Sequence, residues 1–343
     1  MPHSSVFRQS QVIRASNHGG RTTVEVAKLV ASPRPVVVMH PSLRLAALTC
    51  AIAALPATAL AQTLVGSSDS IYTWRGPLPS RALLTVKNYN GPIDVRPATG
   101  TQAEMRAEKR TSRGGGDIRD VAFEIQTASN GDVTICAVYR DNNPCDDNSR
   151  HSDDDRGWRR YVTVGITVLV PRGAQVRVAT GNGAISVERV GGDVQASSGN
   201  GRVNVDGTDG GVRVSTGNGD VSVVGAKGPV RVSTGNGRVN VTTSDGPVEA
   251  RTGNGDIDVS MTQLKANDDM TFSTGSGGVR VTLPSGYNGE LDATTGNGEL
   301  RSDFDLKIQG RMNPRHVRAT IGDGGPRLRL TTGNGRLEVR KGT

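Results

Sequence analysis

The chain has 343 residues, a formal net charge of +8, 45 glycines and only 3% aromatic residues. So few large rings exclude an ordinary α/β enzyme core, and they require small aliphatic side chains to be buried through a regular, repeated geometry. No stretch reaches the roughly 18 to 20 apolar residues of a membrane-spanning helix, which excludes a polytopic membrane protein. The positive charge is concentrated in residues 1–61, and the remainder has 35 basic and 32 acidic residues. We therefore expect no nucleic-acid partner.

Residues 39–61 have the pattern of a secretory signal peptide. Met39 and the cation Arg44 precede an apolar run that ends at Leu55, and the segment closes with Ala59-Leu-Ala61. Small residues at positions minus three and minus one mark a cleavage site. The pattern predicts an exported mature chain that begins at Gln62 and has no transmembrane segment. Residues 1–38 are interpreted as an upstream extension, either untranslated or a long n-region of the signal.

Cleavage would leave two cysteines, Cys136 and Cys145. An even pair in an exported chain predicts a disulfide bond, and closing so small a ring would stabilise the fold by about 2–3 kcal/mol. A redox or metal pair is the alternative. The two cysteines lack C-x-x-C spacing, however, and the nearest histidine, His151, has no second histidine beside it.

One tetrapeptide, Thr-Gly-Asn-Gly or a close variant, recurs from residue 180 onward. Its eight copies begin at Thr180, Ser198, Thr216, Thr234, Thr252, Thr274, Thr295 and Thr332, and the first five copies are 18 residues apart. A fixed period of this length indicates a solenoid. Within one period the apolar residues form two alternating pairs, such as Val212/Val214 and Val221/Val223. Alternation at period two predicts two short strands per coil, each with one face inward.

We therefore predict an all-β fold, a right-handed parallel β-solenoid with 18-residue, two-strand coils and a thin aliphatic core without room for rings. A third short face within the turns is the lesser alternative. The repeats occupy residues 174–343. Residues 62–173 are predicted to form a β-rich N-terminal cap with a polar loop at 141–160, and within them residues 84–95 look like a degenerate ninth copy of the repeat.

The Gly-Asn-Gly segment is predicted to be a turn, because glycine tolerates positive φ and asparagine tolerates the left-handed region. Stacking of the coils would align its asparagines into an amide ladder with a structural role. The members of this turn ladder are Asn182, Asn200, Asn218, Asn236 and Asn254.

Outward positions of the strands form charged rows. On one sheet Arg177, Arg213 and Arg231 are a candidate anion-binding row for a glycan or a lipid headgroup; a solubilising surface is the alternative. On the other sheet Arg202, Asp220, Arg238 and Asp256 alternate in sign along one register, which favours the stacking order.

Neither a metal site, nor a cofactor, nor a catalytic set is expected. A calcium β-roll would place aspartates where this chain has Val203, Val221 and Val239, and an apolar side chain supplies no oxygen ligand. The predicted mature chain has only His151 and His316, and it lacks G-x-S-x-G and H-E-x-x-H motifs.

Three features of the sequence resemble a known family. They are Val162-Thr-Val-Gly-Ile-Thr-Val-Leu-Val-Pro-Arg-Gly173, the Thr-Gly-Asn-Gly repeats, and Gly322-Asp-Gly-Gly-Pro-Arg-Leu-Arg-Leu-Thr-Thr-Gly-Asn-Gly335. Together they are similar to the bacterial DUF4097 "putative adhesin" β-strand repeat family over about residues 80–341. The resemblance implies a parallel β-solenoid at the bacterial envelope, in the periplasm or at the cell surface, and it supplies no catalytic residues.

The leading hypothesis is a noncatalytic exported envelope protein, an adhesin-like scaffold or binding module. Its partner would be an envelope polysaccharide, a lipid headgroup or a protein. The alternative is a carbohydrate-active enzyme, a polysaccharide lyase or glycosidase, on a β-helix.

Overall fold

The computed structural model describes residues 64–112, 115–139, 145, 162–243, 245–264, 268–310 and 313–342. These residues all fall within one compact unit, Ala59–Thr343. The predicted upstream extension, the signal peptide and the loop 141–160 apart from Cys145 lie outside the described residues.

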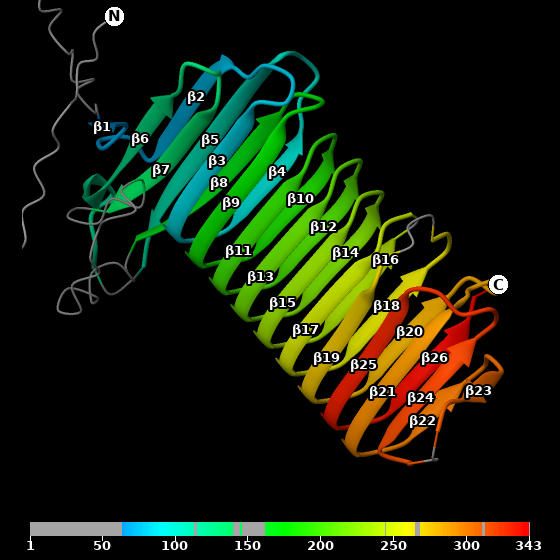
Figure 1. The fold of residues 1–343 in the computed structure, drawn as a ribbon. Coiled ribbons are helices and arrows are strands. Elements are labelled where there is room, and N and C mark those ends of the chain that lie inside the picture. The colour runs from blue at the N-terminus through cyan, green and yellow to red at the C-terminus, as the bar shows by residue number, and fades with distance from the viewer. Residues whose placement is uncertain are drawn as a thin grey trace, which may run out of the picture. The chain divides into compact units, whose positions relative to one another are not determined.

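Two long sheets dominate the described residues (Figure 1). In spatial order, the 14-stranded sheet contains β1 (Leu64–Val65), β6 (Val121–Thr127), β7 (Val133–Tyr139), β3 (Leu83–Asn90), β9 (Gln175–Asn182), β11 (Val194–Asn200), β13 (Val212–Asn218), β15 (Val230–Asn236), β17 (Val248–Asn254), β19 (Met270–Ser276), β25 (Arg327–Asn334), β21 (Gly289–Asn297), β24 (His316–Ile321) and β23 (Leu306–Ile308). The 12-stranded sheet contains β2 (Ile71–Pro77), β5 (Gln102–Thr111), β8 (Val162–Val170), β4 (Ile93–Pro97), β10 (Ile185–Val190), β12 (Val203–Thr208), β14 (Val221–Ala226), β16 (Val239–Thr243), β18 (Ile257–Met261), β20 (Val279–Leu283), β26 (Leu337–Lys341) and β22 (Leu300–Ser302). The short 3-10 helix η1 spans Ile118–Asp120.

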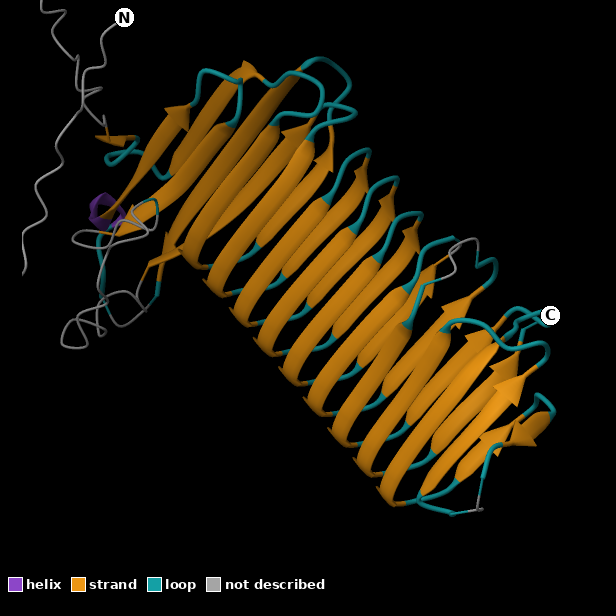
Figure 2. Ribbon diagram, viewed as in Figure 1, coloured by secondary structure: helices purple, strands orange, loops and turns teal. Residues whose placement is uncertain are grey.

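Each central coil contributes one strand to each sheet, and short loops join the two strands (Figure 2). Val194 pairs with Val212, and Val212 with Val230, so equivalent residues 18 positions apart lie side by side in parallel strands. The same register holds in the other sheet, where Val203 pairs with Val221. The predicted β-solenoid with two strands per coil is confirmed.

The core lies between the sheets and consists of the inward valines and their equivalents. Val203, Val205, Val212 and Val214 are all at most 2% exposed, and the corresponding positions of the neighbouring coils are buried in the same way. β-Branched side chains suit this position because they pack well on a pleated surface. The core does admit a ring, since Phe272 is completely buried, so the expectation of a core without rings was too strict.

The repeated threonine faces inward and joins neighbouring coils. Thr234 is 4% exposed, and its hydroxyl donates to the carbonyl oxygen of Gly219 in the preceding coil at 3.1 Å. Equivalent bonds run from Thr180, Ser198, Thr216, Thr252, Thr274, Thr295 and Thr332. A buried carbonyl is thereby satisfied in each turn, a role that the sequence analysis did not assign.

The expected reason for Gly-Asn-Gly was wrong in part. The only described non-glycine residues with positive φ are Arg81 and Arg189, so the asparagines do not adopt the left-handed region. The first glycine is required by close approach instead: a Cβ on Gly217 would lie 2.6 Å from the carbonyl oxygen of Gly199. Strand spacing between coils therefore excludes a side chain at this position.

The degenerate ninth copy is confirmed at the N-terminal end. β3 pairs in parallel with β9, and β4 with β10, so these strands form the coil beside the first regular repeat although about 80 residues separate them. Beyond this coil, β6 and β7 are antiparallel, as are β2, β5 and β8. The buried Lys109 Nζ donates to the carbonyl oxygens of Ser67 and Ile118, both at 3.1 Å, and to those of Gly66 and Val121. Lys109 thus ties the first described residues to the end of the solenoid.

The last two coils are stacked out of chain order. β25 lies between β19 and β21, and β26 lies between β20 and β22. The intervening hairpin explains the arrangement: β24 folds back antiparallel on β21 and occupies its outer edge. The C-terminal coil then pairs with β19 and β21 on its two sides, both in parallel.

Candidate functional site

The predicted basic row lies in one register on the outer face of the 14-stranded sheet. Gln195 pairs with Arg177 on one side and with Arg213 on the other, and Arg213 pairs with Arg231. Their neighbours Val176, Val194, Val212 and Val230 are buried, so alternation along each strand directs these four polar side chains to solvent. The row continues to Glu249 on β17.

Polar contacts are unevenly distributed along this row. Arg177 Nε donates to Gln195 Oε1 at 3.0 Å, and Arg231 Nε lies 3.4 Å from Glu249 Oε2. Glu249 is also bound by Arg251 Nη2 at 2.7 Å. Among the described residues, the exposed guanidinium of Arg213 has neither a hydrogen bond nor an ion pair. Its charge is therefore available to a ligand.

The row lines a groove with a volume of about 390 Å³. Gly211 and Pro229 are part of its lining and stand two residues before Arg213 and Arg231. Both residues are uncharged, so the guanidiniums of Arg213 and Arg231 are the charged groups that β13 and β15 contribute to the groove. Asp193 also lines the groove, and its Oδ1 accepts the amide hydrogen of Gly211 at 2.7 Å.

The asparagines of the turn ladder are the last residues of successive strands of the 14-stranded sheet, and their side chains are hydrogen-bonded to one another. Asn200 Nδ2 donates to Asn182 Oδ1 at 2.9 Å, and the same bond at 2.8 Å links Asn218 to Asn200, Asn236 to Asn218 and Asn254 to Asn236. A further pair joins Asn297 to Asn334 at 2.8 Å. Since the amides bind one another, they form a structural element of the stack.

Cys136 on β7 forms a disulfide with Cys145, with 5.7 Å between their Cα atoms. The bond attaches position 145 to a completely buried residue of β7.

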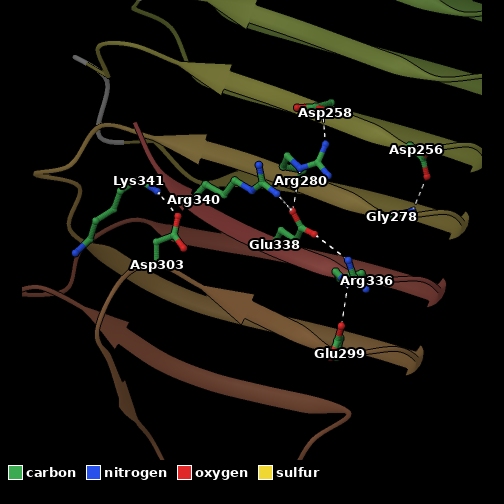
Figure 3. Close-up of polar contacts among 10 residues, drawn as sticks. All are labelled: Asp256, Asp258, Gly278, Arg280, Glu299, Asp303, Arg336, Glu338, Arg340 and Lys341. Atoms are coloured by element: carbon green, nitrogen blue, oxygen red, sulfur yellow. Dashed lines mark hydrogen bonds and ion pairs between the residues drawn. The ribbon is translucent and has the colours of Figure 1, made fainter. Parts of the chain in front are cut away.

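The opposite face, on the 12-stranded sheet, carries a network of ion pairs that sequence reasoning missed (Figure 3). Glu338 on β26 is 7% exposed and accepts from Arg280 at 2.9 Å, Arg340 at 2.7 Å and Arg336 at 3.5 Å. Arg280 continues to Asp258 at 2.8 Å, and Arg336 to Glu299 at 2.9 Å. These residues, apart from Glu299 and Arg340, line a groove of about 480 Å³.

The network favours the ionised form of Glu338. Hydrogen bonding to Arg280 is the main cause that lowers the pKa of Glu338, with Arg340 adding to it. Hydrogen bonds to Glu338 and Asp258 raise the pKa of Arg280. Nearby, the backbone amide of Arg238 lowers the pKa of Asp220, which also pairs with Arg202 at 3.3 Å. The central role of Glu338 could not be identified from sequence, because Arg280 lies on β20, and the adjacency of β20 and β26 depends on the out-of-order coil.

In the part of the chain that the structure describes, no group of three or more His, Cys, Asp or Glu side chains is placed to hold a metal ion. Within the same residues, no helix is long and apolar enough to span a membrane.

Comparison with known proteins gives a family match for the repeat region. The model of the family described as Toastrack DUF4097 matches residues 147–340, more than half of the chain. The chain belongs to this family. The stacked parallel strands of the toastrack are those that carry the basic row, the turn ladder and the Glu338 network. A search of curated proteins finds no match.

Two solved structures also match this toastrack chain. A "putative cell adhesion protein" from Clostridium sporogenes ATCC 15579 has 8% sequence identity and a TM-score of 0.26, with 79% of this chain and 100% of that chain covered. A "putative adhesin" from Bacteroides fragilis NCTC 9343 has 10% identity and a TM-score of 0.39, with 80% and 98% covered.

Proposed function

We propose that the protein is a noncatalytic, exported protein of the bacterial envelope, an adhesin-like scaffold or binding module that uses the outer face of the 14-stranded sheet. The observation that carries the proposal is the groove over Arg177, Arg213 and Arg231, in which one guanidinium lacks a partner among the described residues. A rigid stack of coils holds these side chains at fixed spacing, as a surface for recognition of an extended partner requires.

Export is supported by the signal-peptide pattern of residues 39–61 and by the disulfide, since disulfides persist in oxidising compartments. On the grooved face of the 12-stranded sheet, the buried carboxylate of Glu338 does not fit the role of a glycosidase acid. A glycosidase needs a carboxylic acid with a raised pKa to protonate the leaving group. Glu338 instead has a lowered pKa and is surrounded by arginines.

Cell fractionation with N-terminal sequencing tests the proposed function. We expect the protein in the periplasmic or surface fraction, beginning at Gln62, with Cys136 and Cys145 joined. An uncleaved cytoplasmic chain with two free thiols would contradict export. A glycan and lipid array, probed with the exported protein, tests binding, and turnover of a polysaccharide would contradict the noncatalytic assignment.

A further inference from the structure

We propose that the groove over Arg177, Arg213 and Arg231 binds a linear acidic polysaccharide that lies across the coils. Its carboxylate or sulfate groups would meet successive guanidiniums, and its hydroxyl groups would meet the serines beside them. This inference rests on the proposed function, because it assigns a class of ligand to the same binding face.

The direction of the ligand follows from the register. Arg177, Gln195, Arg213 and Arg231 occupy equivalent positions of β9, β11, β13 and β15. Neighbouring strands are about 4.8 Å apart, so the charged side chains repeat at this interval or at twice this interval across the sheet. A ligand that contacts several of them must extend perpendicular to the strands. A small anion would contact one or two arginines only.

A second row of donors runs parallel to the first. Ser197, Ser215 and Ser233 stand two residues beyond the basic row on the same strands, and therefore on the same face. In the described part of the chain, the hydroxyls of Ser215 and Ser233 make no hydrogen bond, like the guanidinium of Arg213. Guanidinium binds carboxylate or sulfate through paired hydrogen bonds, and a serine hydroxyl both donates and accepts. A sugar chain with acidic groups satisfies both rows.

Two carboxylates lie beside the basic row. Asp193 lines the groove on the side of Gly211, and Glu249 follows Arg231 in the basic row. Both would repel an acidic ligand. The strongest site for an acidic group is therefore over Arg213 and Arg231, because the two are neighbours in register and Arg213 has no partner among the described residues.

The surroundings of the row favour a polysaccharide over other large anions. Membrane binding combines basic residues with apolar side chains that enter the lipid, but the exposed large hydrophobics of the described residues are Leu64, Ile71, Val224 and Ile308. None of them lies on β9, β11, β13 or β15. Single-stranded nucleic acid stacks its bases on aromatic rings, and residues 174–261 contain no Phe, Tyr or Trp.

The test is a calorimetric titration of the exported protein with polygalacturonate oligosaccharides of increasing length. A sulfated dextran, a neutral dextran and phosphatidylglycerol vesicles serve as comparison ligands. We expect affinity to rise with oligomer length until the ligand spans the row, and to fall as salt is added, because the contacts are exposed. The double variant Arg213→Gln/Arg231→Gln should lose about tenfold in affinity, the effect expected for two exposed charge contacts.

The matched control is Arg202→Gln/Arg238→Gln, which removes the same charge from the 12-stranded sheet. There Arg202 pairs with Asp220 at 3.3 Å and Arg238 with Asp256 at 4.0 Å. We expect this variant to bind the acidic oligosaccharide like the unchanged protein. An equal loss in both variants would show unspecific attraction and overturn the proposal, as would unchanged binding by the Arg213/Arg231 variant.

Two further results separate this inference from the proposed function. An exported protein that binds only vesicles or neutral dextran contradicts the acidic-polysaccharide inference and leaves the envelope function in place. A protein retained in the cytoplasm contradicts the proposed function, whatever it binds in the calorimeter.

Discussion

Replacing Glu338 with Gln should destabilise the C-terminal coil, because Glu338 is the common acceptor for three arginines. Its carboxylate oxygens lie 2.9 Å from a guanidinium nitrogen of Arg280, 2.7 Å from one of Arg340 and 3.5 Å from one of Arg336. Gln has nearly the same shape and keeps one acceptor oxygen, but it has no charge. The variant therefore isolates the ionic contribution from packing.

The expected loss of unfolding free energy depends on how exposed the three arginine partners of Glu338 are. Hydrogen bonds to a charged group contribute about 1.5–3 kcal/mol when they are buried, but these arginine side chains are 42–51% exposed and water screens their charges. Arg280 also keeps Asp258, and Arg336 keeps Glu299. We therefore expect Glu338→Gln to lower the free energy of unfolding by about 1–2 kcal/mol in total. Each kcal/mol corresponds to about 2–4 °C in the melting temperature of a large domain.

Urea unfolding at several pH values measures this contribution. Because the folded state lowers the pKa of Glu338 from its ordinary value of 4.5, the stabilisation is fully present above about pH 4.5. It is lost as the pH falls through the lower folded-state pKa. The difference between the unchanged protein and Glu338→Gln should thus be constant from neutral pH to about pH 5 and shrink in more acidic solution.

Glu299→Gln is the matched control. Glu299 also binds two arginines, Arg301 at 2.8 Å and Arg336 at 2.9 Å, but its side chain is 51% exposed. Its replacement should change stability much less than that of Glu338. Equal losses in the two variants, or a Glu338 effect that persists undiminished at pH 3, would refute the assignment of Glu338 as an ionic centre.

Three further predictions concern a threonine bond between coils, the asparagine ladder and the disulfide. Thr234→Val should lower the free energy of unfolding by about 1 kcal/mol by removing the bond to Gly219, and Thr234→Ser should restore most of it; equal urea midpoints for Val and Ser would contradict this role. Asn218→Asp should lower the melting temperature at pH 7, because an ionised carboxylate cannot donate to Asn200, with partial recovery near pH 3 where the acid is protonated. Cys136→Ala/Cys145→Ala should cost about 2–3 kcal/mol in chemical unfolding, and a stability equal to that of the oxidised protein would count against a structural disulfide.

The repeat made most of the fold predictable. In a segment such as 212–223, valines two residues apart identify a strand. The same pattern recurs after 18 residues and identifies the neighbouring strand, so both the strands and their register follow from the sequence pattern. The basic row was predictable for the same reason: once Val212 and Val230 are aligned, Arg213 and Arg231 must be neighbours.

The order of the last coils could not be predicted from the pattern. The copies of the repeat have closely similar strands and turns, and Thr332 pairs with both Thr274 and Thr295. The order is instead decided by the hairpin of β23 and β24, whose antiparallel pairing has no counterpart in the repeat. Lys109 was missed for a related reason, because its acceptors are backbone carbonyls and leave no mark on the sequence.

The out-of-order coil also shortens the exposed sheet edges at the C-terminal end of the solenoid. An edge strand has unpaired backbone groups, through which another chain can pair with it. Stacked in chain order, the C-terminal coil would end the solenoid with β25 and β26, which have 8 and 5 residues of backbone able to pair with another chain. In the observed order this coil is internal, and the two edges at this end of the solenoid are formed by β22 and β23, with 3 residues each. Insertion of the last coil therefore shortens the edges through which another chain could pair, and Glu338 lies on β26, one of the two strands that make this insertion.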